Sequence, residues 1–185
     1  MRRLLLLFAI AGTTSCASSG SSTKPGLDTP TERVIAADNQ GTFRTTVSPK
    51  ANALITAPPN RIFEALAAVY KNLDVPTVTN DPASGRIGNA DFWKSRKLGG
   101  EAISTYLDCG SSITGAAADN YRVYISLLSA VRPDGSGGSE LETAFTATAR
   151  NMEGTTADRV ACGTTGRLEE RMQKGVLARL SVARP

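Results

Sequence analysis

The sequence predicts an α+β fold in which an antiparallel sheet of about six to seven strands packs against two helices. Apolar and polar residues alternate along two long segments in the second half of the chain, which is typical of strands with one buried face. On either side of this region apolar residues recur every three or four positions, as on one face of a helix. The 185 residues are 41% hydrophobic and 21% charged, which is the composition of a globular domain.

The first predicted elements are two short strands, residues 33–37 and 42–47, separated by turn-forming residues. A third strand at 52–56 leads into Pro58 and Pro59, which suit a helix entrance because the N–H they lack is not needed there. The helix predicted at 61–73 ends before Pro76. Its apolar stripe consists of Ile62, Phe63, Leu66, Val69, Tyr70 and Leu73.

The rest of the chain predicts six strands and a final helix. The two longest strands flank a glycine-rich stretch at 133–139, so we expect them to form an antiparallel hairpin. A helix opening after Gly166 places Leu168, Met172, Val176 and Leu180 on one face. The six strands are predicted at residues 75–79, 86–93, 103–109, 121–132, 140–151 and 158–162.

This β-α-β6-α order resembles the helix-grip arrangement of START-like lipid-binding domains and of the helix-grip modules of a barrel-assembly lipoprotein subunit. The resemblance covers about residues 50–182 and rests on element order. It implies a curved antiparallel sheet that wraps the C-terminal helix, with a space between them that can hold an apolar ligand. Small residues on the predicted strands would leave room for one, whereas Phe63, Met172 and Leu180 would fill the space in a packed core. The small residues are Gly88, Ala90, Ala144, Ala147 and Ala149.

The N-terminus has the order of a secretory signal. Arg2 and Arg3 precede a nine-residue uncharged run at 4–12, which is far shorter than the ~20 residues of a membrane-spanning helix. The paired arginines alone would also suit a twin-arginine signal, but the longer motif is missing around them. We interpret residues 1–16 as a signal peptide, residues 17–31 as a flexible Ser/Thr/Gly/Pro linker, and residues 32–185 as a single α+β domain.

The stretch from Thr13 to Cys16 resembles the lipobox of bacterial lipoproteins. The resemblance implies that Cys16 is acylated and becomes the mature N-terminus, so that the lipid attaches the protein to a membrane. Thr13 stands where leucine is usual, which leaves ordinary cleavage after Ala17 as an alternative. Ala17 also stands where an inner-membrane retention signal would have aspartate. We therefore expect an exported protein on the periplasmic face of a bacterial membrane, with the outer membrane favoured.

Cys109 and Cys162 remain as an even pair in an oxidising compartment, where a disulfide is expected. Closing the loop of about 50 residues between Cys109 and Cys162 would stabilise the fold by roughly 4 kcal/mol. A reactive thiol at Cys109 is disfavoured because the neighbouring Asp108 would raise its pKa. A metal-binding dithiol is also disfavoured, because the two cysteines lack CxxC spacing and have no histidine to complete a zinc site.

The chain contains no histidine, which excludes Ser-His-Asp and Cys-His catalysis and histidine-ligated metals. The formal charge of +4 falls to +2 once Arg2 and Arg3 leave with the signal. We predict no catalytic residues, no metal site, no cofactor and no nucleic-acid partner. Glu169 and Glu170 are adjacent on the predicted helix, so their side chains point in different directions and do not form a catalytic carboxylate pair. Asp134 and Glu140 flank the predicted hairpin loop but lack the series of oxygen ligands of an EF-hand calcium loop.

The most distinctive local feature surrounds Trp93, the only tryptophan. Lys94, Arg96 and Lys97 follow it, and aromatic rings beside cations suit docking on anionic head groups, lipopolysaccharide or a glycan. The alternative is an exposed hairpin end with Trp93 turned into the core. The sequence as a whole favours a lipid-anchored, non-enzymatic envelope protein that binds an envelope protein partner. A periplasmic carrier of an apolar small molecule is the alternative.

Overall fold

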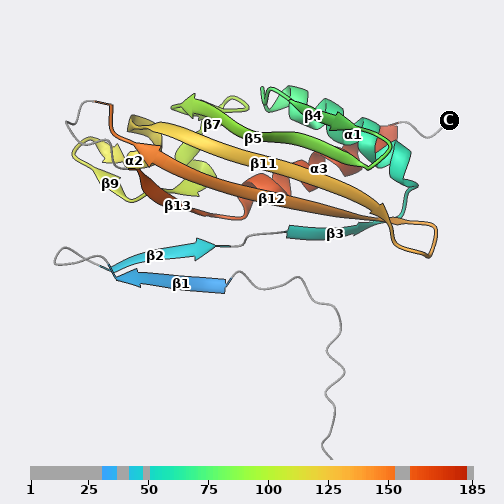
Figure 1. Ribbon diagram of the computed structural model, residues 1–185, viewed down its shortest axis with the longest axis horizontal. Helices are drawn as coiled ribbons and strands as arrows, with labels where there is room; N and C mark the ends of the chain where they lie inside the picture. Colours follow the sequence, from blue (N-terminus) through green and yellow to red (C-terminus); the bar gives the residue numbers. More distant parts are fainter. Residues whose placement is uncertain (1–30, 37–41, 48–50, 153–158, 183–185) are drawn as a thin grey trace, which may run out of the picture.

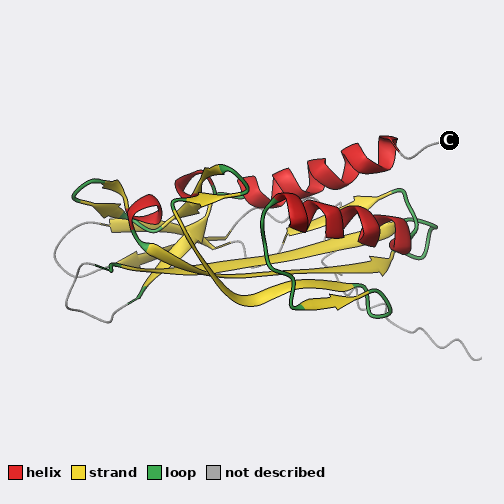
Figure 2. Ribbon diagram, turned by 90° about the horizontal axis from the view of Figure 1, so that it is seen from above, coloured by secondary structure: helices red, strands yellow, loops and turns green. Residues whose placement is uncertain are grey.

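The computed structural model describes residues 31–36, 42–47, 51–152 and 159–182. In this part of the chain the fold is α+β, with an open seven-stranded antiparallel sheet and two long helices on one of its faces (Figures 1 and 2). The predicted fold class is therefore confirmed. The predicted signal, Cys16 and all but the last residue of the predicted linker lie outside the described residues.

The sheet consists of β3 (Ala51–Ile55), β4 (Thr79–Asp81), β5 (Arg86–Ser95), β8 (Leu107–Asp108), β11 (Arg122–Pro133), β12 (Ser139–Arg150) and β13 (Val160–Thr164). The strand order is β4-β5-β11-β12-β13-β8, and β3 also pairs with β12. β3 pairs with residues 139–143 of β12, and β13 pairs with residues 147–149. One edge of β12 therefore holds two strands in succession.

The hairpin of β11 and β12 is the longest feature of the sheet, and it forms as predicted. The two strands pair along their whole lengths, and alternate residues of both are buried. The turn is held by Asp134, whose carboxylate accepts hydrogen bonds from the backbone N–H groups of Ser136 at 2.8 Å and Gly138 at 2.9 Å. One face of the hairpin therefore contributes to the core, and the other is left open.

Two helices cover the buried face: α1 (Pro59–Asn72) and α3 (Arg167–Val182). They lie side by side over the sheet (Figure 2). Gly175 of α3 lies so close to α1 that a Cβ there would be 3.0 Å from a methyl carbon of Val69. Leu66, Met172 and Val176 are fully buried, as the predicted apolar stripes require.

A bulge bends the sheet where β5 crosses β11. The register between these strands shifts between Ile125 and Leu127. Gly88 lies near this shift with φ 143°, and a Cβ there would be only 2.2 Å from the carbonyl oxygen of Leu127. Bulges increase local twist and bend a strand. This position therefore needs glycine, and the bend agrees with the curved sheet that the helix-grip resemblance implies.

Between β5 and β11 the chain is irregular, and the strand predicted at 103–109 is wrong for most of its length. Ile103, Tyr106 and Leu107 are all buried, and their spacing of three and four residues requires a helical turn rather than an extended strand. The segment contains β6 (Lys97–Leu98), β7 (Glu101–Ala102), η1 (Ile103–Thr105), β9 (Ser111–Ser112), β10 (Gly115–Ala116) and α2 (Ala117–Asn120).

Other predicted elements differ less. The strand predicted at 75–79 begins only at Thr79, because Pro76 has no N–H and its carbonyl accepts a hydrogen bond from the Asn89 side chain. The first two predicted strands form a separate antiparallel pair, β1 (Thr31–Ala36) and β2 (Thr42–Val47). The predicted disulfide is present, and it joins Cys109 after β8 to Cys162 in β13.

Candidate functional site

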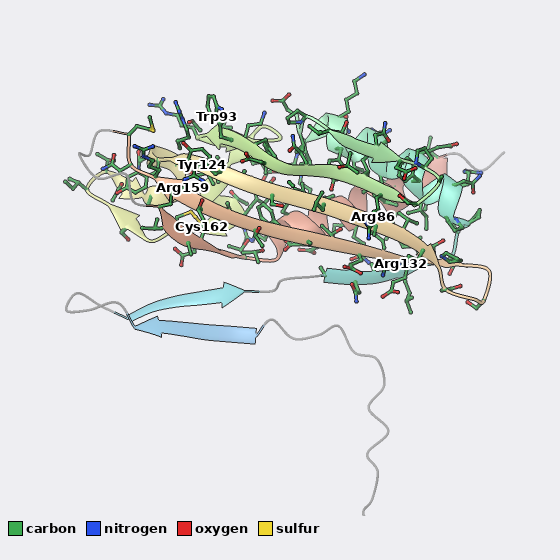
Figure 3. The ribbon with its side chains drawn as sticks, in the orientation of Figure 1. Arg86, Trp93, Tyr124, Arg132, Arg159 and Cys162 are labelled. Atoms are coloured by element: carbon green, nitrogen blue, oxygen red, sulfur yellow. A yellow bond between two sulfur atoms is a disulfide. The ribbon has the colours of Figure 1, made fainter. Side chains whose placement is uncertain are left out.

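Trp93 lies near the end of β5, on the face of the sheet opposite the helices (Figure 3). It is 54% exposed, which rules out the alternative that it turns into the core. The preceding residue, Phe92, takes the core position and is 7% exposed. Successive strand residues point to opposite faces, so only one of these neighbouring aromatic residues can be buried.

The cations that follow Trp93 in the sequence do not share its face. Lys94 is directed to the other side of β5 and forms an ion pair with Asp74, just after α1, at 2.5 Å. Arg96 adopts φ 66° in the turn after β5, and Lys97 is exposed in β6. The structure thus separates Lys94 from Trp93 and leaves Arg96 and Lys97 beyond the end of the strand.

Side chains from distant parts of the chain gather beside Trp93 instead (Figure 3). The guanidinium of Arg122 lies 4.5 Å from the centre of the Trp93 ring, and that of Arg159 lies 3.7 Å from the centre of the Tyr124 ring. The strand register places Tyr124 opposite Trp93 and Arg150 opposite Arg122. We call these five residues the arginine–aromatic cluster.

The positive charge of this cluster is not balanced within the described part of the chain. None of its three arginines forms an ion pair with a described residue. The Nε atoms of Arg122 and Arg150 are buried and have no hydrogen-bond partner among the described residues. Like charges on directly opposed strand residues are destabilising, and a buried donor without an acceptor costs about 1–3 kcal/mol. An anionic ligand beside the guanidinium groups would relieve the repulsion between them.

The other end of the same sheet face is different. There Arg132 of β11 forms an ion pair with Glu142 of β12 at 3.0 Å, and Arg86 lies on the neighbouring strand (Figure 3). Glu140 lies opposite Arg132 in the register of the hairpin. Acidic and basic residues therefore lie together at this end, whereas the arginines at the end with Trp93 form no ion pair with a described residue.

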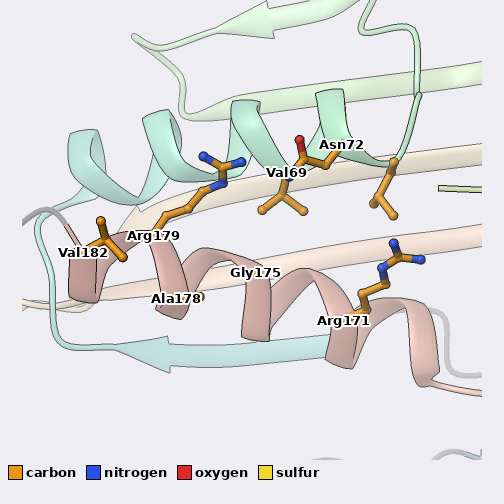
Figure 4. Close-up of a pocket in the computed structure, with 8 residues that line it drawn as sticks. Val69, Asn72, Arg171, Gly175, Ala178, Arg179 and Val182 are labelled. Atoms are coloured by element: carbon orange, nitrogen blue, oxygen red, sulfur yellow. The ribbon is translucent and has the colours of Figure 1, made fainter. Parts of the chain in front are cut away.

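An open groove of about 500 Å³ lies between α1 and α3, on the outer side of the helix layer (Figure 4). Its apolar lining includes Val69, Leu73 and Val182, and Arg171 and Arg179 border it. The Arg171 guanidinium donates hydrogen bonds to the Tyr106 hydroxyl and the Gly99 carbonyl. The groove therefore lies between the two helices and not between α3 and the sheet.

The small residues expected to leave room under α3 are distributed over both faces of the sheet. Ala147 and Ala149 are buried toward the helices, while Ala90 is exposed and Ala144 is half-buried on the open face. Gly88 is packed tightly against β11. The side of α3 that faces the sheet is filled by large side chains, those of Leu168, Met172 and Val176.

Three of the carboxylates considered in the sequence analysis have structural partners. Glu169 is buried and accepts a hydrogen bond from the Thr164 hydroxyl at 2.9 Å, and burial raises its pKa. Its neighbour Glu170 is exposed, and its hydrogen bond and ion pair with Lys174 lower its pKa. Asp134 is engaged in the hairpin turn, where its hydrogen bonds, chiefly that from Ser136, lower its pKa.

Sequence reasoning found Trp93 but missed its partners Arg122, Arg150 and Arg159. They are 29 or more residues away along the chain and come together only through strand pairing. The sequence does indicate that Arg122 pairs with Arg150, because a hairpin register centred on the glycine-rich turn places these two residues opposite each other. The contact between Arg159 and Tyr124 had no comparable signal, because it depends on the path of the chain into β13.

No helix of the described residues is long and apolar enough to cross a membrane. The same residues contain no group of three or more Cys, Asp or Glu side chains placed to hold a metal ion. The chain matches no known family model and no curated protein sequence.

Proposed function

We propose that this protein is a lipid-anchored, non-enzymatic interaction module at the periplasmic face of a bacterial membrane, with the outer membrane favoured. Acylation at Cys16 would supply the anchor, and residues 17–31 would tether the domain within roughly 20 Å of the membrane surface. The open sheet face would supply the docking surface. In the sequence-based prediction the docking residues were Trp93, Lys94, Arg96 and Lys97.

The observation that supports this proposal most is the unbalanced arginine–aromatic cluster. Tryptophan, tyrosine and arginine side chains are enriched at binding surfaces. Arg96 and Lys97, exposed just beyond the end of β5, would extend the positive surface at its border. Glu169, Glu170 and Asp134 have structural partners instead.

Native mass spectrometry of the protein gently extracted from its own membranes tests this proposal. The proposal predicts an acylated chain in complex with another polypeptide. An acylated monomer without a partner would contradict the interaction with an envelope protein.

A periplasmic carrier of an apolar small molecule is the second candidate, and the groove between α1 and α3 is the observation that favours it. Its apolar lining lies next to Arg179, an exposed cation with no ion pair among the described residues. This combination suits an amphiphile with an anionic head. The same spectrum distinguishes the two functions, because a carrier would appear as a monomer with a discrete extra mass that Arg179→Gln reduces.

A further inference from the structure

We propose that the arginine–aromatic cluster binds the phosphate groups of anionic phospholipids, so that the domain lies with this end of its open sheet face against the membrane. The inference rests on the proposed function, because the lipid anchor and short linker are what keep the domain near a membrane surface. It adds a second contact with the membrane, made by folded residues. In this contact the two guanidinium groups would bind phosphate, and the aromatic rings would lie at the interface between lipid and water.

The pair of Arg122 and Arg150 is the center of the proposed phosphate site. The two residues lie directly opposite each other on neighbouring antiparallel strands. Each has a buried Nε–H that lacks an acceptor, and no described carboxylate pairs with either guanidinium. A phosphate presents several strong acceptor oxygens to the fixed fork of a guanidinium. One such group bound at the outer side of both guanidinium groups would offset their mutual repulsion.

The aromatic members of the cluster fit a lipid surface. Tryptophan and tyrosine concentrate at the interface between hydrocarbon and water, where an apolar ring and a polar edge are both accommodated. Trp93 is 54% exposed although it is large and apolar, and Met152, two residues after Arg150, is 51% exposed. An exposed apolar side chain, that of Met152, thus lies close along the chain to Arg150, which has no ion pair with a described residue.

Charge favours the membrane over an acidic protein surface as the occupant. The cluster supplies three cations without any internal acid, which matches the uniformly negative surface of an anionic leaflet. The nearest acid on the same strand is Asp91, which is exposed and forms no ion pair with any described residue. The opposite end of the face has paired acids and bases, as the ion pair of Arg132 with Glu142 shows. The membrane would therefore contact only one end.

The test uses the acylated protein reconstituted in vesicles, because Trp93 is the only tryptophan and reports directly on the site. One set of vesicles contains only phosphatidylcholine, and the other contains about 30% phosphatidylglycerol to give an anionic surface. Both contain phosphatidylcholine brominated in the upper acyl chain, which quenches a nearby indole. We expect quenching and a blue-shifted emission in the anionic vesicles only, and a weakening of both at high salt.

The matched variants identify the residues responsible. Arg122→Gln with Arg150→Gln should weaken docking about 25-fold, from about fivefold per arginine near an anionic surface, and should abolish the quenching. Arg86→Gln with Arg132→Gln removes the same charge from the same face and should leave the quenching unchanged. If the first variant does not fold, the salt dependence of the original protein still decides, because docking to phosphates must weaken as ionic strength rises.

Several results would overturn the inference. Equal quenching in neutral vesicles, or quenching retained without Arg122 and Arg150, would mean apolar contact without phosphate recognition. An emission shift with soluble polyphosphate or an acidic protein, but no quenching by lipid, would mean a soluble polyanion or a protein as the occupant. An unquenched Trp93 in protein that stays with the vesicles would refute membrane docking and leave anchoring intact. Loss of the protein from the vesicles would instead refute the proposed anchor.

Discussion

Removing the disulfide should cost the domain roughly 4 kcal/mol of stability. The bridge joins residues separated by 53 positions, and the chain-entropy model gives about this value for a loop of that length. Cys109 and Cys162 are both buried, so replacement of each by alanine avoids leaving a polar group in the core. With a urea dependence of about 2 kcal/mol per molar, the unfolding midpoint should fall by about 2 M.

The loss should also be local. Apart from the disulfide, β8 is attached to β13 by a ladder of only two residue pairs, Leu107 with Thr164 and Asp108 with Gly163. The Thr165 N–H donates a hydrogen bond to the carbonyl of Tyr106, which adds one further link. Without the disulfide, amides between β8 and α2 should exchange faster than those of the β11–β12 hairpin.

Urea unfolding and hydrogen exchange of the Cys109→Ala/Cys162→Ala variant provide the test, with the oxidised protein as reference. A loss of less than about 1 kcal/mol, with unchanged exchange between β8 and α2, would refute the reasoning. It would mean that buried residues such as Ile103 and Tyr106 hold this segment in place without the covalent link.

Gly88→Ala should destabilise the domain by more than about 3 kcal/mol in urea unfolding, because it adds backbone strain and a clash with the Leu127 carbonyl. Gly100→Ala, which has a positive φ but open space around it, should cost only about 1 kcal/mol, and equal losses would contradict this account. Burial raises the pKa of Glu169 in the folded state, so binding of a proton to this side chain stabilises the fold. This stabilisation is fully present below the pKa of the unfolded state, near 4.5, and is lost as the pH rises through the pKa of the folded state. Glu169→Gln should therefore flatten the fall in stability with rising pH above 4.5, measured by urea unfolding at several pH values, and an unchanged pH profile would show that another group causes it.

The sequence predicts the regular elements well where one periodicity extends over many residues. The β11–β12 hairpin and the two long helices follow from alternating and helical spacing, respectively. Periodicity does not predict the segment between β5 and β11, because its strands are only two residues long and its conformation is held by tertiary contacts. One such contact is the hydrogen bond from the Ser104 hydroxyl to Asp119 at 2.6 Å.

The candidate site shows why nearness in sequence misleads on a strand. Trp93 and Lys94 are neighbours in the chain, but the alternation of a strand sends them to opposite faces. Arg122 reaches Trp93 from the adjacent strand, and Arg150 adds its charge from the strand beyond. Pairing across strands, which a single sequence does not display directly, therefore determines which charges share a surface.

The most direct test of the central claim, that a lipid holds this domain at a membrane, is the mass of the N-terminal peptide from protein isolated from its own membranes. We expect a peptide that begins at Cys16 and carries acyl chains, and a Cys16→Ser variant that is released from the membrane. An unmodified peptide beginning at Ser18, from protein recovered in the soluble periplasmic fraction, would contradict it.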